Sequence, residues 1–176
     1  MKSFKHLFEE FNGTDQIIYV DMDGVLCDFI GGVKKVTGQD FTDPDLNKLV
    51  KKEIKDQIQD YGRFWHELEW HDGGRELWQR IRKYNPQILS AYPKWDRNGI
   101  PGKHEWTRKN LKLQKNRVNL VQRHEKSDYA TNSNGRPNIL IDDYIKNIRE
   151  FEDRGGIGIH HINTSRTIAE LKKLGL

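Results

Sequence analysis

Two acidic residues, Asp21 and Asp23, lie one residue apart directly after the apolar stretch 17–20, and Gly24 follows them. The stretch predicts a short buried strand, and the glycine allows a sharp turn at its end. Ligands of open α/β sheets bind outside the carboxyl ends of the strands. Two neighbouring carboxyl groups can hold different protonation states, because one negative charge favours retention of the other proton. We therefore predict a functional site here, the alternative being an ordinary Asp-Gly turn.

A second acidic pair, Asp142 and Asp143, follows another apolar stretch at residues 139–141. If both stretches are parallel strands of one sheet, the two acidic pairs lie at the same edge, outside the carboxyl ends. The alternative is that these acids cap a following helix, since acidic groups are favoured at a helix N-terminus for electrostatic reasons alone.

The periodicity of apolar residues predicts strands that alternate with helices along most of the chain. Strands are predicted at 87–90, 117–121 and 157–159, and helices at 3–12, 77–84, 101–114, 145–151 and from Thr164 or Ser165 onward. The polar segment 127–138 is typical of a loop. This alternation predicts an α/β fold with a doubly wound parallel sheet.

Residues 29–70 are predicted to be mostly helical, which makes this stretch longer than an ordinary crossover between parallel strands. A helix start is expected at 42–45, and Gly31-Gly32 is expected to change the chain direction. We predict a core of residues 1–28 and 71–176 and a small helical cap of residues 29–70, inserted after the first strand. Four aromatic residues close the cap, either as packing or as a stacking wall for a planar substrate ring: Tyr61, Phe64, Trp65 and Trp70.

The composition of the chain excludes some classes of protein and favours others. Among 176 residues, 30 Lys and Arg against 26 Asp and Glu give a net charge of +4, a scattered excess that favours anionic ligands without indicating a nucleic-acid groove. The single cysteine excludes an internal disulfide and a Cys-rich zinc site. No apolar stretch is long enough to cross a bilayer, and the polar beginning lacks the features of a signal peptide, so we expect a soluble, cytoplasmic protein.

Four motifs, in order, resemble those of the haloacid dehalogenase (HAD) superfamily of phosphohydrolases. They are Asp21-Met22-Asp23-Gly24-Val25-Leu26, Ser90 at the end of an apolar strand, Lys126, and Asp142-Asp143. Within the superfamily, residues 15–150 are most similar to the 5'(3')-deoxyribonucleotidases and related phage and bacterial proteins. This closer resemblance rests on residues 21–29, the Phe64-Trp65 pair, Lys103-x-x-Trp106 and residues 140–143. The second motif departs from the usual Thr-Ser-Pro of the nucleotidases and is Ser90-Ala91-Tyr92.

The resemblance implies a role for each matching residue. Asp21 is the expected nucleophile, and Asp23 is the expected general acid and base. The expected Mg²⁺ ligands are Asp21, Asp23 through its backbone carbonyl, and Asp142, with Asp143 holding a metal-bound water. Phosphate is expected at Ser90, Ala91 and Lys126, and the rest of the substrate at Phe64, Trp65, Lys94 and Lys103.

The predicted function is therefore a Mg²⁺-dependent phosphomonoester hydrolase, most similar to a 5'(3')-deoxyribonucleotidase, whose partner is a small phosphorylated substrate such as a nucleotide. Alternatives within the enzyme class are a phosphatase acting on nucleic-acid ends and one acting on another small phosphometabolite. An alternative of another class is a non-catalytic binding protein that kept the HAD fold. The oligomeric state stays open between monomer and homodimer.

Overall fold

The computed structural model describes residues 16–42 and 48–176. The helix expected at 3–12 lies outside these residues, as does most of the helix start expected at 42–45. Within the described part of the chain, helices alternate with five strands. No helix there is both long and apolar enough to pass through a lipid bilayer.

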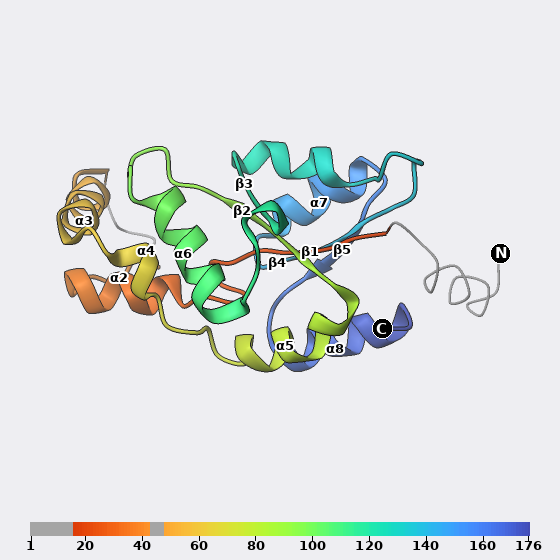
Figure 1. Ribbon diagram of the computed structural model, residues 1–176. Helices are drawn as coiled ribbons and strands as arrows, with labels where there is room; N and C mark the ends of the chain where they lie inside the picture. Colours follow the sequence, from red (N-terminus) through yellow and green to blue (C-terminus); the bar gives the residue numbers. More distant parts are fainter. Residues whose placement is uncertain (1–15, 43–47) are drawn as a thin grey trace.

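The five strands form one parallel sheet in the order β3-β2-β1-β4-β5, which confirms the predicted doubly wound α/β fold (Figure 1). Their bounds are β1 Ile18–Val20, β2 Gln87–Ala91, β3 Val118–Val121, β4 Ile139–Asp142 and β5 Ile157–His160. The chain builds outward from β1 to β3 on one side and then returns to place β4 on the other side. The strand order therefore reverses between β1 and β4, which is where ligands bind in sheets of this type.

Helices cover both faces of the sheet, as a parallel sheet requires. Figure 1 shows α7 on one side, and α5 and α8 on the other. The bounds of these helices are α5 Gly74–Ile81, α7 Ile145–Asp153 and α8 Thr164–Lys173, and the short 3-10 helices are η1 Arg82–Tyr84, η2 Lys115–Arg117 and η3 Arg123–Tyr129. The side chains of β1 alternate between the two faces: Ile18 and Val20 pack in the larger apolar cluster, and Tyr19 packs with Phe151 in the smaller one.

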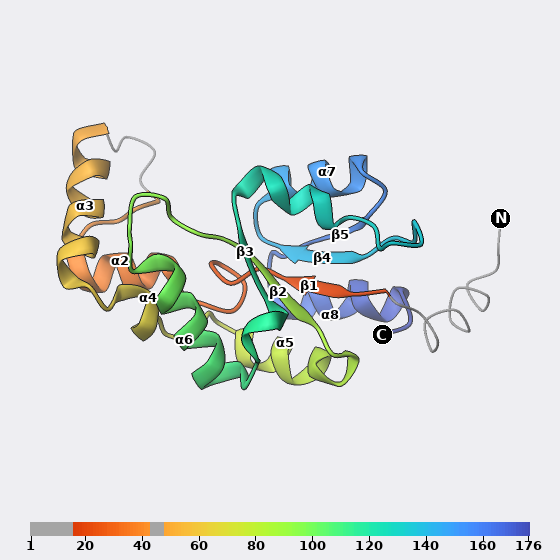
Figure 2. The same ribbon diagram turned by 45° about the horizontal axis from the view of Figure 1, so that its top comes forward.

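Three helices follow β1 and gather beyond the carboxyl ends of the strands (Figure 2). They are α2 Phe29–Thr37, α3 Lys48–Tyr61 and α4 Phe64–Glu67, and α6 Gly99–Leu111 packs against α4. These helices occupy the stretch predicted as a cap, while the division of the chain into core and cap stays a prediction.

The expected change of direction at Gly31-Gly32 is wrong, because α2 continues through both glycines. A Cβ atom on Gly32 would lie 2.6 Å from the Leu68 side chain and 3.2 Å from that of Phe64. The glycine is therefore needed for close packing of α2 against the region of α4, and its helix-breaking tendency is overridden by these contacts.

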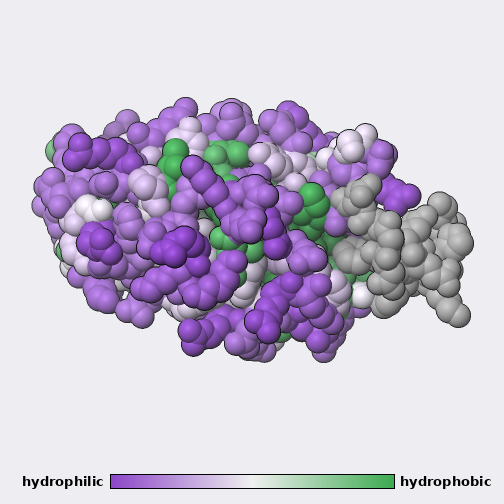
Figure 3. Space-filling view, in the orientation of Figure 1, coloured by the Kyte–Doolittle hydropathy of each residue, from purple (hydrophilic) through white to green (hydrophobic). Residues whose placement is uncertain are grey.

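Two expected boundaries of elements differ from those in the structure because of local hydrogen bonds. Residues 127–129 belong to η3, whose start is fixed by reciprocal bonds between Gln122 and Glu125, so the predicted loop begins only after Tyr129. The side chain of Asn163 accepts the bond from the Arg166 amide and caps α8, where Thr164 or Ser165 was expected. The face of the molecule in Figure 3 is mostly hydrophilic, with apolar residues gathered near its centre.

We predict that Phe151→Ala lowers the free energy of unfolding by about 3–5 kcal/mol, because it leaves a cavity in the smaller apolar cluster. Phe151 is fully buried there. The loss is measured by urea denaturation, with Ile162→Ala as the control, since Ile162 is 52% exposed and should cost less than about 1 kcal/mol. Equal losses in the two variants would contradict this assignment of the core.

Candidate active site

The acids of the first motif stand in a tight turn that follows β1. The carbonyl oxygen of Met22 accepts bonds from the amides of Leu26 and Cys27, both at 2.8 Å. Gly24 has a φ of +75°, and a Cβ atom on it would lie 2.2 Å from an oxygen of Asp143. A glycine is required here both by the backbone conformation and by the close approach of that carboxylate.

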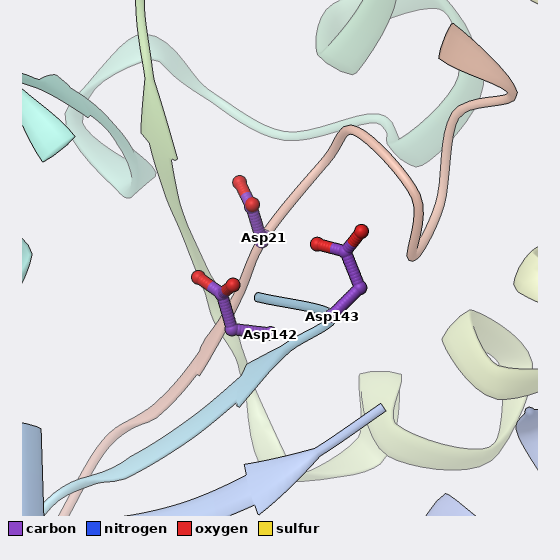
Figure 4. Close-up of side chains that lie close together, drawn as sticks. All are labelled: Asp21, Asp142 and Asp143. Atoms are coloured by element: carbon purple, nitrogen blue, oxygen red, sulfur yellow. The ribbon is translucent and has the colours of Figure 1, made fainter. Parts of the chain in front are cut away.

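Three carboxylates meet at the edge where the strand order reverses (Figure 4). Asp21 follows β1, Asp142 ends β4 and Asp143 comes next, and one oxygen from each lies within 4.8 Å of the others. The backbone positions them, because the Asp21 amide donates to the Ile141 carbonyl at 2.9 Å and so holds the two strand ends side by side. Three hard oxygen donors at this spacing fit a Mg²⁺ ion, which is usually bound by one or two carboxylates together with water and substrate.

Lys126, on η3, is the buried cation among these acids. Its Nζ lies 2.9 Å from Oδ2 of Asp21 and 2.7 Å from Oδ2 of Asp142, and the side chain is 1% exposed. Asp142 also accepts bonds from the Asn147 side-chain amide, at 3.0 Å to each oxygen, and from the Tyr144 backbone amide at 2.9 Å. The expected lysine of the third motif is thus brought to the acidic residues.

Lys103, on α6, is a second fully buried lysine. Its Nζ donates to Oδ2 of Asp23 at 2.7 Å, to Oγ of Ser90 at 2.9 Å and to the carbonyl of Ala91 at 2.8 Å. The end of β2 and the first motif are therefore joined by one ammonium group. The site combines two cations with clustered carboxylates, which is the charge arrangement that phosphoryl transfer requires.

Comparison with known proteins decides the family. The model of the family described as 5' nucleotidase, deoxy (pyrimidine), cytosolic type C protein matches residues 15–172. The chain belongs to this family. It is therefore a HAD-type phosphatase related to the deoxyribonucleotidases, and the predicted enzyme class is confirmed.

Several solved structures align with this chain at low identity. A hydrolase from Streptococcus pneumoniae TIGR4 aligns with a TM-score of 0.52 and 12% identity, over 90% of this chain and 100% of that one. A hydrolase from Pseudomonas syringae gives 0.47 and 17%, over 88% and 90%, and a HAD hydrolase, family IA, variant 3 from Entamoeba histolytica HM-1:IMSS gives 0.45 and 11%, over 89% and 99%. Among curated proteins, none matches the sequence significantly.

The two acids of the nucleotidase's first motif have opposite pKa shifts. Burial raises the pKa of Asp21, but the charges of Lys126 and Lys103 outweigh it and leave that pKa below its usual value. Burial raises the pKa of Asp23, the Asp21 charge adds to this effect, and Lys103 opposes it without reversing it. Asp21 is therefore the ionised member of the pair and Asp23 is the member that favours a proton.

Burial and neighbouring charges also shift the pKa values of Lys126, Asp142 and Asp143. Burial lowers the pKa of Lys126, but Asp21 and Asp142 raise it more, so the lysine stays charged. Burial, followed by the charge of Asp21, raises the pKa of Asp142, and withdrawal from water together with both neighbouring acids raises that of Asp143 to about 7. The negative charge of Asp21 thus favours protonation of Asp142 and Asp143, and a bound cation would relieve this repulsion.

The four residues predicted to contact the rest of the substrate separate into two groups. Trp65 lines a cavity of about 250 Å³ that also reaches Asp23 and Ala91, and Lys103 Nζ lies 5.2 Å from the centre of the Trp65 ring. The other residues lining the cavity are Phe29, Phe41, Lys55, Tyr92, Pro93 and Trp95. Phe64 is not among them and packs edge-on against Phe29 and Trp65, while Lys94 is exposed and outside the lining.

Sequence reasoning did not identify several residues that complete the site. Asn147 holds both oxygens of Asp142, and Asp96 accepts a bond at 2.6 Å from the indole of Trp65. The position of Asn147 in the first turn of the helix after Asp142-Asp143 was an available signal, since a side chain there faces the strand end. Asp96 lies in an irregular segment, where no periodicity marks its partner.

We predict that Mg²⁺ raises the midpoint of thermal unfolding and that Asp142→Asn abolishes the increase, because the ion binds the folded acidic residues and not the unfolded chain. At one hundred times the dissociation constant the ion should add about 2.7 kcal/mol to the free energy of unfolding. Differential scanning calorimetry with and without MgCl₂ measures it. The exposed Asp153→Asn should keep the increase, and an unchanged increase in Asp142→Asn would remove Asp142 from the ligands.

Proposed function

We propose that this protein is a Mg²⁺-dependent 5'(3')-deoxyribonucleotidase, which releases phosphate from deoxynucleoside monophosphates through an aspartyl-phosphate on Asp21. The observation that carries the proposal is the opposite protonation preference of two acids in one turn, each joined to its own buried lysine. Membership of the nucleotidase family supports the substrate class, and the family's description as a cytosolic type supports a cytosolic location.

In the first step, an Asp21 carboxylate oxygen attacks phosphorus, and the bond from phosphorus to the nucleoside oxygen breaks. Asp23 gives its proton to that departing oxygen, so the nucleoside leaves neutral. The lowered pKa of Asp21 keeps the nucleophile ionised, and the raised pKa of Asp23 keeps the proton available.

In the second step, Asp23 is a carboxylate and takes a proton from the attacking water. The water oxygen bonds to phosphorus as the bond from phosphorus to Asp21 breaks, and inorganic phosphate leaves with Asp21 restored. Lys126, Lys103 and the Ser90 hydroxyl lie beside these acids, where they can hold phosphate oxygens. When bound by Asp21, Asp142 and the Asp23 carbonyl, with Asp143 on a coordinated water, Mg²⁺ would supply further positive charge for the transferring group.

The cavity beside Asp23 supports a nucleoside as the leaving group. Its walls are largely aromatic, with Phe29 stacked on Trp65 at a ring distance of 5.7 Å and Trp95 tilted against Trp65 at 6.1 Å. Planar bases stack on such faces. The cavity opens directly onto the acid that protonates the leaving oxygen, so a base held there extends from a phosphate at Asp21.

We predict that Asp21→Asn reduces phosphate release from dTMP or dUMP by at least a thousandfold, because the amide cannot form the acyl phosphate. A colorimetric phosphate assay in MgCl₂ measures it, with Asp153→Asn as a control of equal charge change. Full activity in Asp21→Asn would exclude the proposed nucleophile. A wild-type protein that binds dTMP without releasing phosphate would favour the binding-protein alternative.

We also predict that Trp95→Ala raises KM for dTMP about tenfold or more and leaves kcat/KM for glycerol 2-phosphate nearly unchanged, because stacking of one base contributes about 1–3 kcal/mol. Steady-state kinetics on both substrates measures the difference. Equal losses on both would show that the aromatic wall does not hold a base.

A 5'-phosphorylated oligonucleotide used in competition with dTMP distinguishes a mononucleotidase from an enzyme acting on nucleic-acid ends.

A further inference from the structure

A second cavity, of about 290 Å³, lies between α5 and the end of α6 and shares no residue with the acidic site. Its lining is Trp70, Arg75, Trp78, Gln79, Arg82, Asn110, Leu111, Lys112, Leu113 and Arg117. Arg82 and Arg117 come shortly before β2 and β3, at the amino ends of these strands, whereas the acidic site follows carboxyl ends. We propose that this cavity is a binding site for a nucleoside triphosphate.

The positive charge of the cavity favours an anionic ligand. Four of its residues are cationic (Arg75, Arg82, Lys112 and Arg117) and none is acidic. Within residues 16–42 and 48–176, none of the four forms an ion pair with a carboxylate. Unpaired cations that share one concave surface repel one another, and a ligand with several negative charges removes this repulsion.

The arrangement of the cations fits a chain of phosphates better than a single one. Arg75, Trp78, Gln79 and Arg82 recur at helical spacing and so line one face of α5, with Arg82 at its end. Arg75 and Arg82 are two turns apart, about 10 Å along the helix. The guanidinium of Arg117 is anchored by a 2.5 Å bond to the Pro86 carbonyl and keeps further donors for a ligand oxygen. A triphosphate carries enough charge and length to contact these separate groups.

The remaining lining fits a nucleoside. Trp70 is half-buried, and the Cζ of Arg75 lies over its ring, 5.6 Å from the ring centre. Trp106 packs edge-on against the same ring, at 5.0 Å between ring centres, and so fixes this aromatic surface in place. Gln79 and Asn110 place amide groups in the same lining, where they can bond to the edge of a base.

The size of the cavity favours one nucleotide over a strand of nucleic acid. A single strand is bound in a groove that continues over several nucleotides, with aromatic residues repeated along it. Here the cations and the half-buried Trp70 surround one cavity. The proposed ligand is therefore a single nucleoside triphosphate, with its base on Trp70 and its phosphates on the cations.

The test is isothermal titration calorimetry of the full chain with ATP in EDTA. We expect the wild type to bind one ATP per chain and Arg75→Gln/Arg82→Gln to bind it at least tenfold more weakly. Lys112→Gln should also bind ATP more weakly. This variant changes a single exposed side chain, so it tests the site even if the double variant folds poorly. The matched control is Arg149→Gln/Arg166→Gln, which removes two exposed arginines from α7 and α8 and should bind ATP as the wild type does.

Four results would overturn the proposal. They are no ATP binding by the wild type at millimolar concentration, equal weakening in the control variant, inorganic triphosphate binding as tightly as ATP, and displacement of ATP by a much lower concentration of a single-stranded oligonucleotide. Trp95→Ala locates the ligand, since Trp95 lines only the active-site cavity. ATP binding should survive in Trp95→Ala and weaken in Trp70→Ala, and the reverse pattern would place ATP in the active site.

Discussion

The site depends on one buried ammonium group. Lys126 lies between the carboxylates of Asp21 and Asp142, and all three side chains are nearly withdrawn from water. Each buried charge costs several kcal/mol of desolvation, which only close opposite charges and complete hydrogen bonding offset. This requirement explains why Asp142 also accepts bonds from Asn147 and the Tyr144 amide. The parallel pairing of β1 with β4 brings the two carboxylates to the one place where a single lysine reaches both.

The two acids of the first motif differ although each of them pairs with a buried lysine. Asp21 pairs with Lys126 and Asp23 pairs with Lys103, yet their pKa values move in opposite directions. Each lysine is close to its acid, so the difference comes from the balance of the surroundings. Both acids feel the charges of Lys126 and Lys103, and Asp21 also accepts a bond from Ser90. For Asp23 burial outweighs the lysines, the negative Asp21 adds to it, and the buried Oδ1 has no hydrogen-bond partner in the described residues. One turn of backbone thus holds two acids whose pKa values are shifted in opposite directions.

Features that follow from the local periodicity of the sequence were predictable. Features that depend on how distant elements pack together were not. The apolar stretches before Asp21 and Asp142 predicted β1 and β4, because a fully buried parallel strand needs a continuous apolar run. Phe64 and Trp65 are adjacent aromatics of similar burial, yet only Trp65 lines the cavity, and their residue types do not distinguish them. Similarly, the polar composition after Ser127 concealed the 3-10 turn that carries Lys126 into the core.

One helix connects the two cavities of the molecule. Lys103, near the start of α6, holds Asp23 and Ser90, whereas Asn110 and Leu111, at its end, line the basic cavity. Trp106 lies between them, with its indole bonded to the Leu68 carbonyl at 2.7 Å and its ring against Trp70. Because Trp106 is fully buried and closely packed, it anchors α6 between the two cavities. The position of the ammonium group beside the proton donor is therefore set partly by the packing around Trp70, on the wall of the basic cavity.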